Sequence, residues 1–178
     1  MLATPSDHSS HNLLLAALPP AEMHVFREQG QKVFLHEGKT VQAAGVDTEW
    51  VFFPTTALLS LMGVTQDGLS VETGLVGKEG MVGLQQYFGP HTQPLDCVVQ
   101  QEGEVCQAPV ALLRQANLPT LQRCLLGYAN YRLTELAQAA VCNKFHLVRQ
   151  RFTRWLLTAR DRSGKDHMEF TQELLSAM

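Results

Sequence analysis

Residues 50–84, WVFFPTTALLSLMGVTQDGLSVETGLVGKEGMVGL, alternate short apolar segments with turn-forming residues. Asp67-Gly68 stands between two apolar runs, an arrangement that favours the tight turn of a β-hairpin. Segments of the same kind continue on both sides of this stretch: QKVFLHEG (31–38), KTVQAAG (39–45), DCVVQQ (96–101) and GEVCQA (103–108). Short apolar segments at regular spacing, separated by turn signals, predict an antiparallel β-sandwich or barrel.

Apolar residues at helical spacing lie on either side of this strand-rich region. Residues 12–28 favour two short helices, the second beginning at Pro19-Pro20, because proline suits the first turn of a helix. Further short helices are expected in EGMVGLQQYFG (79–89) and PVALLRQA (109–116), a long helix from Pro119 to about Phe145, and another from about Leu147 to Arg162. The sequence therefore predicts an α+β chain in which a β domain precedes two long helices.

The long helix, placed at 118–146, carries two apolar rows. One row repeats at intervals of three and four residues, which is the heptad pattern of a helix that packs against another helix. We therefore favour a parallel homodimer built on this row, while a single helix lying wholly on its own core remains the alternative. The predicted dimerisation residues are Leu126, Ala129, Leu133, Leu136 and Ala140, and the second row contains Leu121, Leu125 and Tyr128.

Positive charge gathers near the C-terminal end of the chain. The 178 residues carry a formal net charge of −3, but residues 144–165 contain seven Lys and Arg residues against one Asp, a net charge of +6. Such a segment is either a solvated helix face or the electrostatic footprint of a nucleic-acid binder. Arg149 and Arg151 are the residues we single out as candidate contacts to DNA phosphates.

Several classes of protein are disfavoured by the sequence. No apolar run reaches the length of a transmembrane helix, and the first residues lack the basic and apolar regions of a signal peptide. We therefore expect a cytoplasmic protein, without a membrane partner, whose four cysteines form no disulfides. No metal site is expected either, because neither a CxxC pair nor an H-x-H pair occurs, and no hydrolase or nucleotide-binding motif indicates an enzyme.

Three stretches, residues 50–84, RFTRWLLTARDR (151–162) and FTQELLSAM (170–178), occur in an order that resembles the Crp/Fnr family of bacterial transcription regulators. The resemblance implies that the β domain is a cyclic-nucleotide-binding-like, double-stranded β-helix (jelly-roll) sensor domain. It also implies that a winged helix-turn-helix domain follows, whose first helix begins at Thr171. The recognition helix that would enter the major groove then lies beyond Met178, so we expect a truncated or cleaved chain.

On this resemblance the chain divides into four parts. Residues 1–11 form a flexible N-terminal arm, and residues 12–117 form the β-roll domain. Residues 118–146 form the dimerisation helix, and residues 147–178 are the N-terminal part of the truncated DNA-binding domain.

The resemblance also places a candidate effector pocket. In members that bind cyclic AMP, an Arg-Ser pair opens the strand after the short helix, and this pair falls on Gln93-Pro94 here. No Lys or Arg occurs between Lys78 and Arg114, although a buried phosphate needs a cation. We therefore expect neither cyclic AMP binding nor any evident cofactor. The candidate pocket residues are Gly77, Glu79, Gly80, Gln93, Pro94, Leu136 and Ala137.

The resulting hypothesis is a homodimeric, DNA-binding regulator that senses an unknown effector. Its partners would be a second copy of the chain and double-stranded DNA, which requires the missing C-terminal part, and RNA polymerase is a further candidate. Two alternatives stay open: a stand-alone cyclic-nucleotide-binding-like sensor module without DNA binding, and a cupin-type metalloenzyme.

Overall fold

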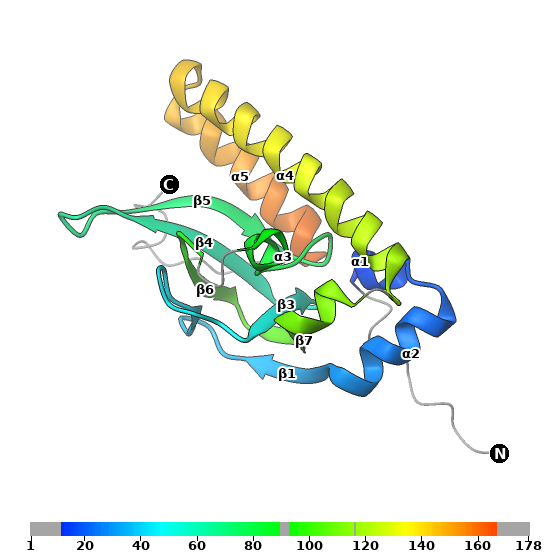
Figure 1. Cartoon of the computed structure of the whole chain (residues 1–178). Helices are drawn as coiled ribbons and strands as arrows, with labels where there is room; N and C mark the ends of the chain where they lie inside the picture. The colour runs from blue at the N-terminus through cyan, green and yellow to red at the C-terminus, as the bar shows by residue number, and fades with distance from the viewer. Residues whose placement is uncertain (1–11, 90–92, 116, 167–178) are drawn as a thin grey trace.

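The computed structural model of the chain describes residues 12–89, 93–115 and 117–166. Helices and antiparallel strands follow one another in the order that the apolar periodicity predicts (Figure 1). The helices are α1 (Leu13–Ala16), α2 (Pro20–Gln29), α3 (Leu84–Phe88), the 3-10 helix η2 (Val110–Arg114), α4 (Pro119–Phe145) and α5 (Val148–Ser163). The strands are β1 (Gln31–Leu35), β2 (Thr40–Gln42), β3 (Trp50–Pro54), β4 (Leu58–Val64), β5 (Ser70–Val76), β6 (Asp96–Gln101) and β7 (Gly103–Pro109).

The strands form two antiparallel sheets that pack face to face as a jelly roll. Sheet A has the strand order β1-β7-β3, and sheet B has the order β2-β6-β4-β5. Strands β4 and β5 form the long hairpin that the Asp67-Gly68 dipeptide predicts, and Gly68 adopts a φ of +81°, which glycine tolerates without strain. β5 pairs only with β4 and therefore leaves one edge of sheet B for a helix to cover.

The space between the two sheets is filled by apolar side chains that alternate along each strand. On β4, Leu59 and Leu61 point into this core, whereas Leu58 belongs to a separate cluster on the other face of the strand. This alternation follows from the two-residue period of a strand. The core residues are Leu35, Phe52, Ala57, Leu59, Leu61, Val76, Val82, Cys97, Val99 and Val105.

Helices cover the outer face of sheet A. Phe53 of β3 packs edge-to-face on Phe26 of α2, with ring centroids 5.3 Å apart. The first half of α4 joins the same cluster through Leu121, Leu125 and Tyr128, which are buried. The second apolar row of the long helix therefore packs on its own β domain.

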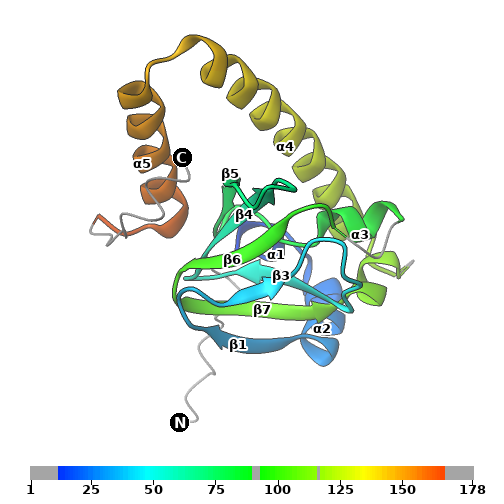
Figure 2. The ribbon, with the colours of Figure 1, turned by 90° about the vertical axis from the view of Figure 1, so that its left-hand side faces the viewer.

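The two long helices leave and rejoin the β domain. Figure 2 shows α4 extending away from the sheets and α5 turning back toward them, so that the two helices diverge in this view. The C-terminal half of α5 contacts β4 and β5, where Ala159 and Trp155 pack on Leu58 and Leu75. One side of the space between α4 and α5 is thus bounded by strand β5.

Asn12 anchors the beginning of the described chain. Its fully buried amide group donates hydrogen bonds to the carbonyl oxygens of Pro54 (2.9 Å) and Gly80 (2.8 Å), and its side-chain oxygen caps α1. The β-roll domain expected from residue 12 therefore begins with a buried side chain. The arm expected over 1–11 and the helix expected from Thr171 lie outside the described residues.

Two further observations concern the described part of the chain. All four cysteines are free thiols. None of the helices that the structure describes combines the length and the apolar character needed to cross a membrane.

Candidate functional site

Arg162, in the last turn of α5, is buried among groups from three other elements. Its side chain is only 5% exposed. The guanidinium pairs with Glu79 (Nε to Oε1, 3.1 Å) and with Glu135 of α4, and it donates to the Tyr131 hydroxyl (2.9 Å) and to the Leu75 carbonyl. Burial opposes the charged form, but the two carboxylates outweigh it and raise the pKa of Arg162. The guanidinium therefore stays charged inside the protein.

Arg132 of α4 extends this buried network. Its Nη1 donates to Glu135 (2.6 Å) and to the carbonyl oxygen of Leu75 (3.2 Å). Glu135 thus bridges two arginines, and one carbonyl of β5 accepts hydrogen bonds from both. The free edge of strand β5, the middle of α4 and the end of α5 are joined at this point.

The loop before α3 belongs to the same network. Glu79 accepts hydrogen bonds from the backbone N–H of Gly77 at 3.2 and 3.1 Å in addition to its ion pair with Arg162. A Cβ at Gly77 would lie 2.7 Å from the Arg162 carbonyl oxygen, so α5 approaches as closely as a glycine allows. A Cβ at Gly80 would lie 2.1 Å from the Tyr128 hydroxyl of α4. Both glycines let a helix pack directly on the loop.

Glu72 of β5 forms a second polar contact between the sheet and α5. Its carboxylate accepts hydrogen bonds from the Ser60 hydroxyl and from Trp155 Nε1, both at 2.6 Å. Burial raises the pKa of Glu72, and these two hydrogen bonds, which favour the charged form, offset only part of that effect.

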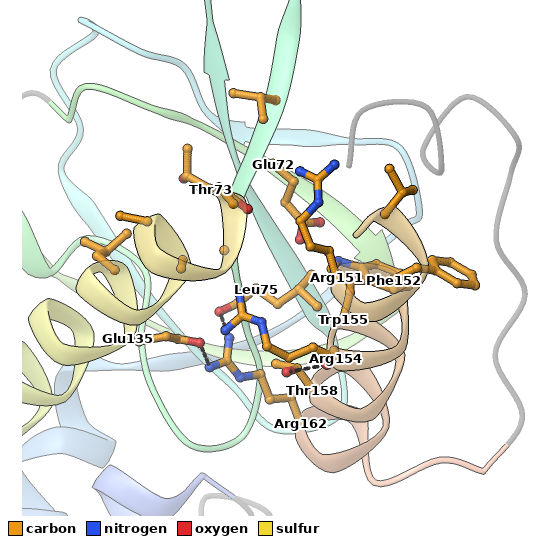
Figure 3. Close-up of a pocket in the computed structure, with 17 residues that line it drawn as sticks. Glu72, Thr73, Leu75, Glu135, Arg151, Phe152, Arg154, Trp155, Thr158 and Arg162 are labelled. Atoms are coloured by element: carbon orange, nitrogen blue, oxygen red, sulfur yellow. Dashed lines mark hydrogen bonds and ion pairs between the residues drawn. The ribbon is translucent and has the colours of Figure 1, made fainter. Parts of the chain in front are cut away.

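A cavity of about 400 Å³ lies between β5, the second half of α4 and α5. Figure 3 shows Glu72, Glu135 and Arg162 in its wall, together with side chains of α5 such as Arg151 and Trp155. The lining residues are Val71, Glu72, Thr73, Gly74, Leu75, Glu135, Leu136, Ala139, Ala140, Asn143, Val148, Arg151, Phe152, Arg154, Trp155, Thr158 and Arg162.

The residues predicted for the effector pocket lie in different parts of the structure. Gly77, Glu79 and Gly80 lie in the loop held by Arg162 and Tyr128, and Leu136 lines the cavity. Ala137 is exposed on α4 and is not in the cavity lining.

Gln93 and Pro94 are also absent from that lining. The side chain of Gln93 is buried, and its carbonyl oxygen accepts a hydrogen bond from Gly45 N–H (2.9 Å), whereas Pro94 is exposed.

The predicted dimerisation row lies on the outer face of α4. Leu126, Leu133 and Leu136 are 54%, 67% and 45% exposed, although leucine is among the residues most often buried. Ala140 is exposed and Ala129 is half-buried. The helix thus has one row on its own domain and a second row that is largely exposed in the single chain, although Leu136 and Ala140 of that row also line the cavity.

The arginines of the basic segment lie in different environments along α5. Arg149 is exposed, whereas the Nε of Arg151 is buried and that of Arg162 is in an ion pair. The sequence analysis counted Arg162 in the basic segment, interpreted as either a solvated helix face or a nucleic-acid contact, and missed its buried role. One feature of the sequence could have indicated this buried network. The second apolar row of the long helix, Leu121, Leu125 and Tyr128, continues at the same spacing into Arg132 and Glu135, the residues of α4 that belong to the network.

No group of three or more His, Cys, Asp or Glu side chains that could hold a metal ion occurs in the segments that the structure describes.

Comparison with solved structures shows which known proteins share this architecture. A putative transcriptional regulator of the Crp/Fnr family from Eubacterium rectale matches 94% of this chain and 80% of its own, with a TM-score of 0.71 and 11% identity. CLP, the c-di-GMP-responsive global regulator of Xanthomonas campestris, matches 78% of this chain and 71% of its own, with a TM-score of 0.66 and 16% identity. The chain has the fold of the Crp/Fnr regulators.

The same cyclic-nucleotide-binding fold also occurs outside transcription regulators. The regulatory subunit of a cAMP-independent protein kinase A from Trypanosoma brucei matches 72% of this chain and 49% of its own, with a TM-score of 0.61 and 16% identity. These matched proteins are regulators rather than enzymes. No protein-family model and no curated protein sequence matches the chain.

Replacing Arg162 by Gln should destabilise the fold strongly, because Glu79 and Glu135 would stay buried without their shared cation. Breaking a buried ion pair from one side costs about 3–5 kcal/mol. The matched control is Arg160→Gln, whose exposed pair with Asp166 should be worth at most about 1 kcal/mol. Urea unfolding of both variants at equal protein concentration measures the difference, and equal losses would contradict the proposed role of Arg162.

Glu72 should make stability depend on pH in a defined direction. Because its pKa in the folded chain is raised above the ordinary 4.5, the folded chain binds the proton more tightly than the unfolded chain. Stability contributed by this group is therefore full at and below about pH 4.5 and decreases as the pH rises through the folded pKa. Relative to Glu72→Gln, wild type should lose stability between pH 4.5 and 8.

Urea unfolding across that pH range measures this effect, and Glu49→Gln, at an exposed carboxylate, is the control. A stability difference between wild type and Glu72→Gln that grows in favour of wild type with rising pH would contradict the assignment.

Proposed function

We propose that this chain is a regulator of the Crp/Fnr type, with a β-roll sensor domain, a dimerisation helix and the first helix of a DNA-binding domain. The observation that carries the proposal is the joint arrangement on α4 and α5. An apolar heptad row lies exposed along the helix that leaves the β-roll, and an arginine-rich helix follows it directly. A sensor module without DNA binding would not need the arginine-rich helix.

The exposed row of α4 supports a two-fold dimer in which the helices pack against each other. Residues of a heptad row repeat on one face of a helix, and the alanines in this row allow close approach of a second helix. In such a dimer Leu126, Leu133 and Leu136 would be covered by their symmetry mates, and the burial of their exposed apolar area would drive association.

Leu133→Glu should dissociate this dimer, because it places two carboxylates together at the symmetry axis. Thr134→Glu, exposed on the same helix but outside the row, adds the same charge and should leave the dimer intact. Sedimentation velocity of wild type and both variants measures the oligomeric state. A dimer that survives Leu133→Glu would exclude this row as the interface.

The basic face of α5 supports DNA as the partner. Arg149 is exposed there, and arginines on such a face neutralise phosphates, which position a protein on DNA without reading its sequence. Base readout would come from a recognition helix, which the described residues do not include. Since its partner would be the genome, we place the protein in the cytoplasm.

The chain should bind duplex DNA weakly and without sequence preference. Phosphate contacts alone lead to dissociation constants of about 10⁻⁴–10⁻⁶ M at physiological salt and to a steep decrease of affinity with salt. Arg149→Gln should reduce the salt slope by about 1 per chain, whereas Lys39→Gln, exposed on the β-roll, should not change it.

Fluorescence anisotropy with two unrelated labelled duplexes at several salt concentrations tests these expectations. No binding at low salt would favour the sensor module without DNA binding, and tight binding to one duplex only would show that the chain reads bases by itself.

The effector of this regulator is, in our proposal, not cyclic AMP. Gln93 and Pro94 offer no cation for a phosphate, and Glu79 of the predicted loop is already paired with Arg162. Isothermal titration with millimolar cyclic AMP should show no heat of binding. A micromolar dissociation constant would mean that the strand register behind the assignment of Gln93-Pro94 is wrong.

A further inference from the structure

We propose that the cavity between β5, α4 and α5 binds a small organic anion with an apolar body, held at its charged end by Arg151. The cavity is distinct from the loop 77–80, none of whose residues lines it. Its volume of about 400 Å³ falls in the range of about 300–1,000 Å³ that is usual for small-molecule sites. The inference concerns binding by the chain itself and does not depend on the proposed DNA binding.

The two helices supply apolar walls to the cavity. Leu136, Ala139 and Ala140 line it from α4, and Phe152 and Trp155 line it from α5. Such walls favour a ligand whose body is a hydrocarbon chain or an aromatic ring, since apolar surface leaves water on binding.

The charges in the wall leave positive groups without a partner. Glu135 is paired with Arg132 and Arg162, and Glu72 already accepts hydrogen bonds from Ser60 and Trp155. Within the described residues, neither Arg151 nor Arg154 forms an ion pair, so the cavity wall carries these two cations against one carboxylate, Glu72, that is not paired with an arginine.

Arg151 is the side chain in the cavity wall that most strongly favours an anionic ligand. Its Nε is buried and has no hydrogen-bond partner in the part of the chain that the structure describes. Figure 3 shows it extending from α5 toward strand β5 and Glu72. A buried charged donor without an acceptor is costly, and a carboxylate or sulfonate matches the planar guanidinium with two parallel hydrogen bonds.

A second copy of the chain is the other conceivable occupant, because Leu136 and Ala140 belong to both the cavity and the predicted dimer row. That row is apolar along its length and offers Arg151 no acceptor. The unpartnered guanidinium therefore favours the organic anion.

Anilinonaphthalene sulfonate, an aromatic anion whose fluorescence rises in apolar sites, is the probe for this proposal. Phenylnaphthylamine has the same rings without the sulfonate and is the neutral control. Fluorescence titration should show at least about tenfold tighter binding of the sulfonate, since one charge-assisted hydrogen bond is worth about that factor. Arg151→Gln should remove most of this preference while leaving the binding of phenylnaphthylamine unchanged.

Two further variants make the result specific to the cavity. Arg160→Gln removes an exposed arginine of the same helix that does not line the cavity, and it should leave the binding of both probes unchanged. Ala139→Leu fills part of the cavity and should weaken both probes, with circular dichroism confirming that the variant folds.

Three outcomes would overturn the proposal. Equal affinity for the sulfonate and the neutral probe would show binding to apolar surface only. Equal loss of sulfonate binding in Arg151→Gln and Arg160→Gln would show a nonspecific charge effect. Binding of the sulfonate to the Leu133→Glu monomer but not to wild type would show that a second copy of the chain fills the cavity.

Discussion

The buried charge of Arg162 connects α5, α4, strand β5 and the loop before α3. A guanidinium removed from water loses several kcal/mol of solvation unless carboxylates and carbonyl oxygens replace its hydration shell. Glu79, Glu135, Tyr131 and the Leu75 carbonyl all take part in that replacement. Because these groups belong to different elements, each element can move only if the others lose a buried contact.

This coupling gives the fold a physical route for regulation. The loop 77–80, which the resemblance to the Crp/Fnr family predicts to be part of an effector pocket, is joined through Glu79 to the last turn of α5. A ligand that displaced Glu79 or changed the angle between α4 and α5 would alter how the basic helix is presented. The cavity between the same helices is a second place where binding energy would act on that angle, and its wall shares Glu135 and Arg162 with the buried network.

Much of the fold follows from local patterns in the sequence. Apart from the stretch that forms α3, each apolar segment between residues 31 and 109 forms a strand, and Asp67-Gly68 forms the turn of the β4–β5 hairpin. The long helix expected over 118–146 runs from Pro119 to Phe145, with Leu121 and Leu125 on its own domain and Leu133 exposed. The network around Arg162 and the cavity between β5, α4 and α5 were much harder to predict from the sequence. Of the residues predicted for an effector pocket, only Leu136 lines the cavity.

The difference between these two results lies in the range of the interactions involved. The period of a strand or helix, the turn at Gly68 and the two apolar rows of α4 depend on residues within a few positions of each other, so the sequence by itself determined them. The environment of Arg162 depends on a carboxylate 27 residues away and a carbonyl 87 residues away. Only the tertiary structure decided that this arginine is buried in an ion-pair network while Arg149, on the same helix, stays in solvent. An arginine has the same charge in both settings, and only the packing of distant elements around it sets the cost of removing that charge from water.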